Sequence, residues 1–274
     1  MIKHKFFTPF VAFIMILLTV PEFARAEGDD LRSAVQNPIS SLISLPFRLT
    51  YDSGASNGDG TILNIQPVVP VNIGEWNLVN RAIIPVANVD GAIPGPNNPN
   101  PKPGGSASGL GDINYSAYFS PVKYNKVIWG VGPSINMPTA SEDQLGSGKW
   151  SAGITGVALS AQKWGSMGVL GRQLWSFAGD SDRGDVDQTL IQPFLNYNLE
   201  NSWFLITDMS WTANWEADSN NRWTVPVGGG VGRVFKIGNQ AINSRLEAYH
   251  NAEKPEGAPD YNITFTFQFL FPKK

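Results

Sequence analysis

The stretch YNITFTFQFLF, residues 261–271, alternates between apolar and polar side chains. Six apolar or aromatic residues share one parity, while asparagine, threonine and glutamine occupy most of the other. Successive side chains of a β-strand point to opposite faces, so the stretch predicts a strand with one apolar and one polar face. Such a strand suits a membrane barrel, with its apolar face toward lipid, and also a soluble sandwich, with that face toward the core.

Repetition of this pattern at barrel-like length favours the membrane barrel. Strands of about 11 residues, tilted by about 40°, cover slightly less than 30 Å, the height of a membrane band, whereas soluble strands usually have about five or six residues. Twelve strands are predicted, at 44–51, 61–71, 76–86, 110–121, 127–138, 149–161, 166–177, 188–199, 202–215, 222–234, 241–249 and 261–271.

The connections between these strands alternate in length. Five are short: 72–75, 122–126, 162–165, 200–201 and 235–240. Five are longer: 52–60, 87–109, 139–148, 178–187 and 250–260. Only the connection 216–221 blurs this contrast. Outer-membrane barrels have short periplasmic turns and longer outer loops, and an even strand number returns both termini to the periplasm. We therefore predict an all-β, antiparallel transmembrane β-barrel of about 12 strands, located in the outer membrane of a Gram-negative bacterium.

The nine tryptophans fall at the ends of the predicted strands. Indole favours a membrane interface because its ring prefers apolar surroundings and its N–H needs a polar partner. The alternative is scattered core tryptophans of a soluble β-protein. One belt lies beside the short connections and comprises Trp76, Trp129, Trp164 and Trp203. The other lies beside the long connections and comprises Trp150, Trp175, Trp211, Trp215 and Trp223.

The N-terminus has the pattern of a secretory signal. Lys3 and Lys5 precede an apolar run at 6–20, and Ala-Arg-Ala at 24–26 supplies small residues for cleavage before Glu27. A retained anchor is the alternative, but the run is shorter than the roughly 20 residues that a spanning helix needs. We predict a cleaved signal peptide at 1–26, a short periplasmic segment at 27–43 and a β-barrel domain at 44–274.

Composition excludes several classes of function. Removing residues 1–26 takes away three basic and one acidic side chain, which leaves 17 basic and 22 acidic ones, so no nucleic-acid partner is expected. The chain has no cysteine, so no disulfide, zinc–thiolate site or thiol nucleophile is available. We expect neither a cofactor nor a metal.

Two segments outside the strands could cover the ends of a barrel. A helix-like stretch at 31–36 is followed by Asn37-Pro38 and could pack at the periplasmic mouth. The connection 87–109 is rich in proline and glycine, which suits either an extended lid or a disordered surface loop. Prolines inside the predicted strands each remove a ladder donor and predict bulges or bends, at Pro67, Pro70, Pro85, Pro133, Pro193 and Pro226.

Eight charged residues have the parity of the lumen and are the candidate pore-lining residues: Arg81, Asp112, Lys149, Arg172, Asp208, Arg222, Arg245 and Glu247. A mid-strand charge facing lipid would cost about 2–4 kcal/mol, so the five that lie near mid-strand should point inward and pair: Arg81, Arg172, Asp208, Arg245 and Glu247. They form either a selective polar lining or a salt-bridge network that plugs a narrow barrel. Arg172 and Asp208 are a candidate pair that narrows the pore.

Catalytic and metal-binding signals are poor. His250 is predicted in an outer loop without a nucleophile arranged beside it, so we predict no enzyme and no catalytic residue. Asp180, Asp182, Asp185 and Asp187 crowd one outer loop, but their spacing fails the EF-hand template, and a solvated acidic loop is the simpler interpretation.

Several collinear motifs resemble the transporter family labelled "MetA-pathway of phenol degradation", some members of which carry the misleading label neuromedin U. The resemblance extends from about residue 37 to the end of the chain and rests on NPISSLISLPF (37–47), NIQPVVP (64–70), GLGDI (109–113), WGVGP (129–133), LGSGKW (145–150), WSFAG (175–179), QPF (192–194), WTVP (223–226) and FLFP (269–272). It implies an outer-membrane barrel, and the family name implies uptake of aromatic compounds.

These observations predict a passive channel or transporter for small apolar or aromatic molecules. A non-conducting structural or adhesion barrel is the alternative. The expected partners are outer-membrane lipid and lipopolysaccharide, a small-molecule substrate and the barrel-assembly machinery. Twelve strands lie between small, side-chain-filled barrels and porins of about 16 strands, so we expect a narrow conduit.

Overall fold

The computed structural model describes residues 31–56, 58–91, 93–94 and 98–272, so the predicted signal peptide at 1–26 lies outside the described residues. The described part contains a short helical segment at 31–35, two 3-10 helices and fifteen strands. The 3-10 helices are η1 (Asp143–Leu145) and η2 (Ser219–Asn221). The strands are β1 (Ile43–Ser53), β2 (Gly60–Ile65), β3 (Val68–Ile73), β4 (Trp76–Asp90), β5 (Ser106–Leu110), β6 (Ile113–Pro121), β7 (Ile128–Met137), β8 (Lys149–Gln162), β9 (Gly165–Gly179), β10 (Asp187–Asn198), β11 (Trp203–Asp208), β12 (Trp211–Asn214), β13 (Trp223–Ile237), β14 (Gln240–Glu253) and β15 (Tyr261–Phe271).

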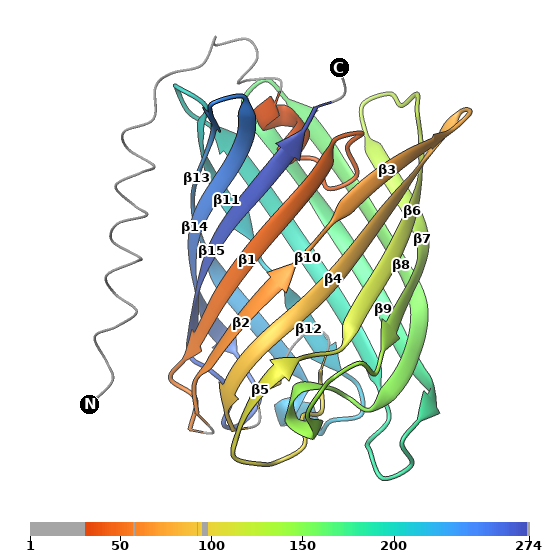
Figure 1. Ribbon diagram of the computed structural model, residues 1–274, viewed down its shortest axis with the longest axis vertical. Coiled ribbons are helices and arrows are strands. Elements are labelled where there is room, and N and C mark those ends of the chain that lie inside the picture. The colour runs from red at the N-terminus through yellow and green to blue at the C-terminus, as the bar shows by residue number, and fades with distance from the viewer. Residues whose placement is uncertain (1–30, 57, 92, 95–97, 273–274) are drawn as a thin grey trace.

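These strands form one antiparallel sheet that closes into a barrel (Figure 1). Closure is made by β1 and β15, which pair from Ile43 opposite Phe271 to Ser53 opposite Tyr261. Three spans of the wall consist of two strands each, β2 with β3, β5 with β6, and β11 with β12, so the described strands make twelve spans. The predicted twelve-stranded, all-β antiparallel barrel is confirmed.

A proline adjoins each interrupted span. Pro67 lies between β2 and β3 and directly precedes β3. Between β5 and β6, the Gly111 N–H donates to the Pro85 carbonyl at 2.8 Å, and between β11 and β12 the Met209 N–H donates to the Pro193 carbonyl at 3.2 Å. Proline has no N–H, so the ladder loses a bond and a strand can bend there. The prolines therefore divide spans without opening the barrel.

The strand β14 is longer than the predicted strand at 241–249. Its register shifts between Val225 and Pro226, and β14 continues to Glu253, which lies opposite Val225. His250 therefore lies within β14, whereas the sequence predicted an outer loop. The sequence after Tyr249 is polar and does not by itself predict a strand. Pairing with β13 and β15 keeps these residues in β14.

Connection length distinguishes the two ends of the barrel. The short connections, residues 31–42 and the end of β15 lie at one end, which we call the turn end, and the longer connections lie at the other, which we call the loop end (Figure 1). Side chains alternate along the wall, so that Ile263 is 45% exposed on the outside whereas Thr264 is 1% exposed inside. The outward face is apolar, as expected of a barrel in lipid.

Tryptophans gather at both ends on the outer face. At the turn end, the rings of Trp76 and Trp129 lie edge to face at 6.0 Å. At the loop end, Trp215 and Trp223 make the same contact at 6.0 Å. The Trp76, Trp129 and Trp215 side chains are exposed rather than packed in a core, which is the arrangement of interfacial belts.

The interior at the turn end is apolar, which the sequence did not predict. One cluster of inward side chains there includes Val79, Leu159 and Phe194, and it packs against Ile39 of the N-terminal segment. A second includes Phe204, Val234 and Leu270 and packs against Leu31 and Leu42. Within the part of the chain that the structure describes, no helix is long and apolar enough to cross a membrane.

Candidate functional site

The lumen contains two cavities in series. The larger, the loop-end cavity, has a volume of about 600 Å³ and lies beneath the outer connections. The smaller, the turn-end cavity, has a volume of about 130 Å³ and lies against the N-terminal segment. Five side chains line both cavities and form the boundary between them, which we call the constriction: Arg48, Gln66, Arg81, Leu170 and Gln192.

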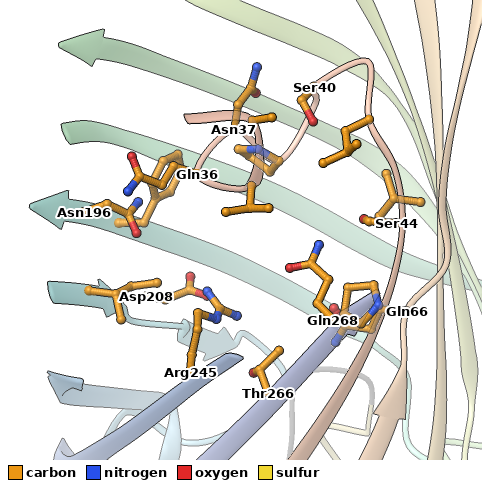
Figure 2. Close-up of a pocket in the computed structure, with 18 of the residues that line it drawn as sticks. Gln36, Asn37, Ser40, Ser44, Gln66, Asn196, Asp208, Arg245, Thr266 and Gln268 are labelled. Carbon is orange, nitrogen blue, oxygen red and sulfur yellow. The ribbon is translucent and has the colours of Figure 1, made fainter. Parts of the chain in front are cut away.

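Two arginines and two carboxylates form a charge quartet beside the constriction. Arg48 Nη1 lies 3.4 Å from Asp208 Oδ2, and Arg48 Nη2 lies 3.8 Å from Glu247 Oε2. Arg245 Nη1 lies 3.7 Å from Asp208 Oδ2, and Arg245 Nε lies 3.2 Å from Glu247 Oε1. Figure 2 shows Asp208 and Arg245 side by side in the lumen. The quartet is neutral as a whole and joins β1, β11 and β14 across the lumen.

Neutral polar groups hold the carboxylates of the quartet in place. The Tyr249 hydroxyl donates to Glu247 Oε2 at 3.1 Å and accepts the Asp208 N–H at 2.9 Å. Gln192 Nε2 donates to Asp208 Oδ1 at 2.6 Å. Because Glu247 is fully buried, the ion pairs and these hydrogen bonds must replace the water that its charge loses.

Arg81 and Arg172 lie on β4 and β9, and both line the loop-end cavity. Arg81 Nη2 donates to the neutral Gln66 Oε1 at 3.0 Å. Arg172 interacts electrostatically with the Tyr118 phenol, and it lies close enough to Arg81 for their positive charges to repel. This part of the cavity wall is therefore basic.

Residues 98–102 of the long connection after β4 cover the loop end of the lumen. Asn100 is their main anchor: its Nδ2 donates to the Asp185 carbonyl at 3.0 Å, and its Oδ1 accepts from Asn214 Nδ2 at 2.7 Å. Asn98 Nδ2 donates to the Gln144 carbonyl at 3.1 Å. The structure thus favours the lid over the disordered loop for this part of the connection.

Arg183 ties the lid to the connection between β7 and β8. Its guanidinium donates to the carbonyls of Asp143 at 3.0 Å, Gly146, and Asn100 at 3.5 Å. Lys102 Nζ lies 2.7 Å from Asp143 Oδ2, and this hydrogen bond is the main cause that lowers the pKa of the exposed Asp143 carboxyl. The lid is therefore held by polar contacts with the neighbouring outer connections.

The acidic and glycine-rich motifs of the loop end serve these connections. Asp112 Oδ2 accepts from both the N–H and the hydroxyl of Ser147 at 2.7 Å, which fixes the stretch before β8. Lys149 Nζ lies 3.2 Å from Asp185 Oδ1, and hydrogen bonds from Lys149 and then Ser176 lower the pKa of the Asp185 carboxyl. No group of three or more His, Cys, Asp or Glu side chains suited to a metal ion occurs in the described residues.

The N-terminal segment, residues 31–42, covers the turn end. Arg32 Nη1 donates to the carbonyls of Leu199 at 2.7 Å and Trp203 at 3.2 Å, and Gln36 Nε2 donates to Asn198 Oδ1 at 2.9 Å. In Figure 2 the segment lies along the turn-end cavity, with Gln36 above Asn196. Both ends of the lumen are therefore covered by chain segments outside the wall.

The structure brings together only part of the predicted set. The loop-end cavity is lined by Arg81, Asp112, Arg172 and Arg222, and the turn-end cavity by Arg81, Asp208 and Arg245. Glu247 is buried within the quartet, and Lys149 lies at the loop end with Asp185. Asp208 forms ion pairs with Arg48 and Arg245, and the candidate pair of Arg172 with Asp208, which did not require direct contact, stays a prediction. Sequence reasoning missed Arg48, although its parity in the stretch 44–51, with Ser44 and Thr50, could have identified it.

Catalytic machinery does not emerge from the remaining candidates. The His250 ring packs 6.0 Å from the ring of Tyr261, which is exposed on the outer face.

The glycine run of the sequence, Gly228, Gly229 and Gly230, lies within β13, where a Cβ on Gly230 would come within 1.9 Å of the Leu246 carbonyl oxygen. The glycines therefore permit close approach of β13 and β14.

No family model matches this sequence, and no curated protein sequence matches it. The structure is similar to that of an outer-membrane channel from Pseudomonas putida F1, with a TM-score of 0.60 and 14% identity over 86% of this chain and 97% of that chain. It also aligns with a bacterial polysaccharide outer membrane secretin, with a TM-score of 0.42 and 12% identity over 85% of this chain and 99% of that chain. The first likeness shows that the fold is that of an outer-membrane β-barrel.

Proposed function

We propose that this protein is an outer-membrane channel through which small apolar or aromatic molecules diffuse without an energy source. The observation that carries the proposal is the pair of cavities in series along the lumen, which only side chains separate. Passage then requires movement of the constriction and of the two covering segments, while the hydrogen-bonded wall stays intact. The TM-score of 0.60 with an outer-membrane channel supports this assignment.

The lining of the loop-end cavity suits small solutes. Apolar side chains such as Ile62, Ile83 and Leu190 alternate with polar ones such as Asn114 and Gln188. Ligand cavities of about 300–1,000 Å³ with a mostly apolar wall and a few placed polar groups are typical of small-molecule sites. A volume of about 600 Å³ falls in this range.

The orientation follows from the same barrel rules. We place the turn end in the periplasm and the loop end outside, facing lipopolysaccharide. The signal peptide at 1–26 and the final strand, with Phe271, would direct export and recognition by the barrel-assembly machinery. We assign no enzymatic activity. Membership of the transporter family that the sequence motifs resemble stays an expectation.

A non-conducting structural barrel is the second candidate, and the charge quartet favours it. Four paired charges and two covering segments could equally close a barrel whose outer surface does the work. Solute entry into proteoliposomes distinguishes the two functions. A channel should admit small neutral aromatic solutes faster than empty liposomes do, and a variant lacking residues 31–40 should admit them faster still. Entry at the rate of empty liposomes in both proteins would favour the structural barrel.

A further inference from the structure

The charges that line the loop-end cavity are unequal. Four arginines and two aspartates line it: Arg48, Arg81, Arg172, Arg222, Asp52 and Asp112. Arg48 is neutralised within the quartet, and Asp112 accepts the hydrogen bonds of Ser147. The other three arginines outnumber the two aspartates, which leaves the cavity with a surplus of positive charge that attracts anions in a setting partly shielded from water.

Arg81 and Arg172 concentrate this charge near the constriction. They reach the same cavity from β4 and β9, and their positive charges act on each other. The hydrogen-bond acceptor described for Arg81 is the uncharged Gln66 Oε1, so the Arg81 charge is not balanced by that contact. Two guanidinium groups facing one cavity are the donors that bind carboxylates best, because each offers N–H groups in a planar fork.

Apolar side chains line the same cavity beside the two arginines. Leu170 precedes Arg172 by two residues on β9, Leu190 lies opposite Arg172 on β10, and Ile83 follows Arg81 by two residues on β4. Two residues along a strand span about 7 Å, so a small ligand can reach the guanidinium groups and these apolar side chains together. A ligand that satisfies both must carry an anionic group at one end of an apolar body.

We propose that the loop-end cavity is a binding site for small amphipathic monoanions, with a carboxylate held between Arg81 and Arg172 and an apolar body against Ile83, Leu170 and Leu190. This inference rests on the proposed channel function and narrows its substrate class from apolar or aromatic molecules to their carboxylates. A neutral aromatic would not balance the surplus positive charge of the cavity, and a purely polar anion would leave the apolar side chains in contact with water.

Calorimetry on the purified, detergent-folded protein tests the site with matched pairs of ligands. The pairs are para-tert-butylbenzoate with para-tert-butylbenzamide, and octanoate with octanamide, so that the aromatic and aliphatic sources of a carboxylate are compared. Each acid should bind at least about tenfold more tightly than its amide, a difference of about 1.4 kcal/mol, because hydrogen bonds to a charged group are stronger than those to a neutral one. Acetate, which has no apolar body, should bind more weakly than either acid.

Variants locate the charge that is responsible. Arg81→Gln and Arg172→Gln should each weaken binding of the acid by about tenfold and leave the amide unchanged, whereas Arg172→Lys should retain most of the preference. Lys126→Gln, which removes an exposed charge at the turn end, is the matched control and should change neither affinity. Heat-modifiable migration on gels verifies that each variant is folded.

Two results would overturn the inference. One is equal binding, or no binding, of acid and amide by the wild-type protein, which needs no variant to interpret. The other is unchanged acid binding by both folded Gln variants. Failure here is separate from failure of the channel function, because binding is measured without flux: a protein that admits neutral aromatics but does not prefer the acid is a channel without this site.

Discussion

Arg48 on β1 lies 3.4 Å from Asp208 on β11, 160 residues later in the chain, and this ion pair crosses the lumen. It joins two spans that are not neighbours in the wall, as does the pairing of Arg48 with Glu247 on β14. The wall already holds the strands by backbone hydrogen bonds, so the quartet adds a brace at the level of the constriction.

Removing one carboxylate from this brace should destabilise the barrel. Asp208→Asn leaves Arg48 and Arg245 with one negative partner instead of two, and we expect a loss of about 3 kcal/mol, the usual effect of stranding a buried charge. Denaturant unfolding in lipid vesicles measures the change. Asp182→Asn, at an exposed loop position, should change stability by no more than about 0.5 kcal/mol. Equal stability of the two variants would contradict the brace.

Loss of Arg183 should open the loop end. Arg183→Ala removes the hydrogen bonds to the carbonyls of Asp143, Gly146 and Asn100, so residues 98–102 should leave the mouth more often. The expected result is faster solute entry into proteoliposomes with unchanged barrel stability. Lys163→Ala, which removes a charge from the β8–β9 turn, serves as the control. A rate identical to that of the wild-type protein would show that the lid does not limit passage.

The N-terminal segment should detach when Arg32 is replaced. Arg32→Ala removes the donors to the Leu199 and Trp203 carbonyls, while the apolar contacts of Leu31 and Leu42 remain. Hydrogen exchange measured on peptides covering residues 31–42 should accelerate several-fold. Exchange in β15 should stay slow, which separates local release from unfolding. Persistent protection of residues 31–42 would mean that apolar packing alone holds the segment.

Acid should loosen the lid. The pKa of Asp143 is lowered in the folded protein, chiefly by the hydrogen bond from Lys102 and then by the Lys102 and Arg183 charges. A carboxyl with a lowered folded pKa stabilises the fold above its unfolded value of about 3.9, and loses that effect as pH falls through the folded pKa. Solute entry should therefore rise below about pH 4. Asp143→Asn should show fast entry at pH 7 already and a smaller acid response, whereas Asp182→Asn should keep the wild-type profile.

Sequence patterning predicted the wall because strand periodicity survives in each span. The alternation from Tyr261 to Phe271, the length of the strands and the tryptophans at their ends identify an outer-membrane barrel without any knowledge of strand pairing. Inward parity also placed Arg81, Arg172 and Arg245 in the lumen. The alternation in β1 also directs the Arg48 side chain into the lumen, so the same pattern identifies this residue.

Interactions across the lumen could not be predicted from the chain. The partner of Asp208 depends on how far each span is shifted against the next, and this shift is set by bulges and prolines such as Pro193 and Pro226. The apolar filling by Val79 and Phe194 also escaped prediction, because an apolar side chain has the same pattern whether it faces lipid or a covered lumen. Lid contacts such as Asn100 with Asn214 follow no periodicity at all.

The central claim, that solutes pass through the lumen, is tested most directly by blocking the constriction chemically. The chain has no cysteine, so Gln66→Cys introduces a single thiol where the two cavities meet, and Leu205→Cys introduces one on the exposed outer face. Entry of a small neutral aromatic solute into proteoliposomes is measured before and after modification with a methanethiosulfonate reagent. The channel account predicts that modification slows entry for Gln66→Cys and leaves it unchanged for Leu205→Cys. Entry that is insensitive to modification at residue 66, or no faster than in empty liposomes, would contradict it.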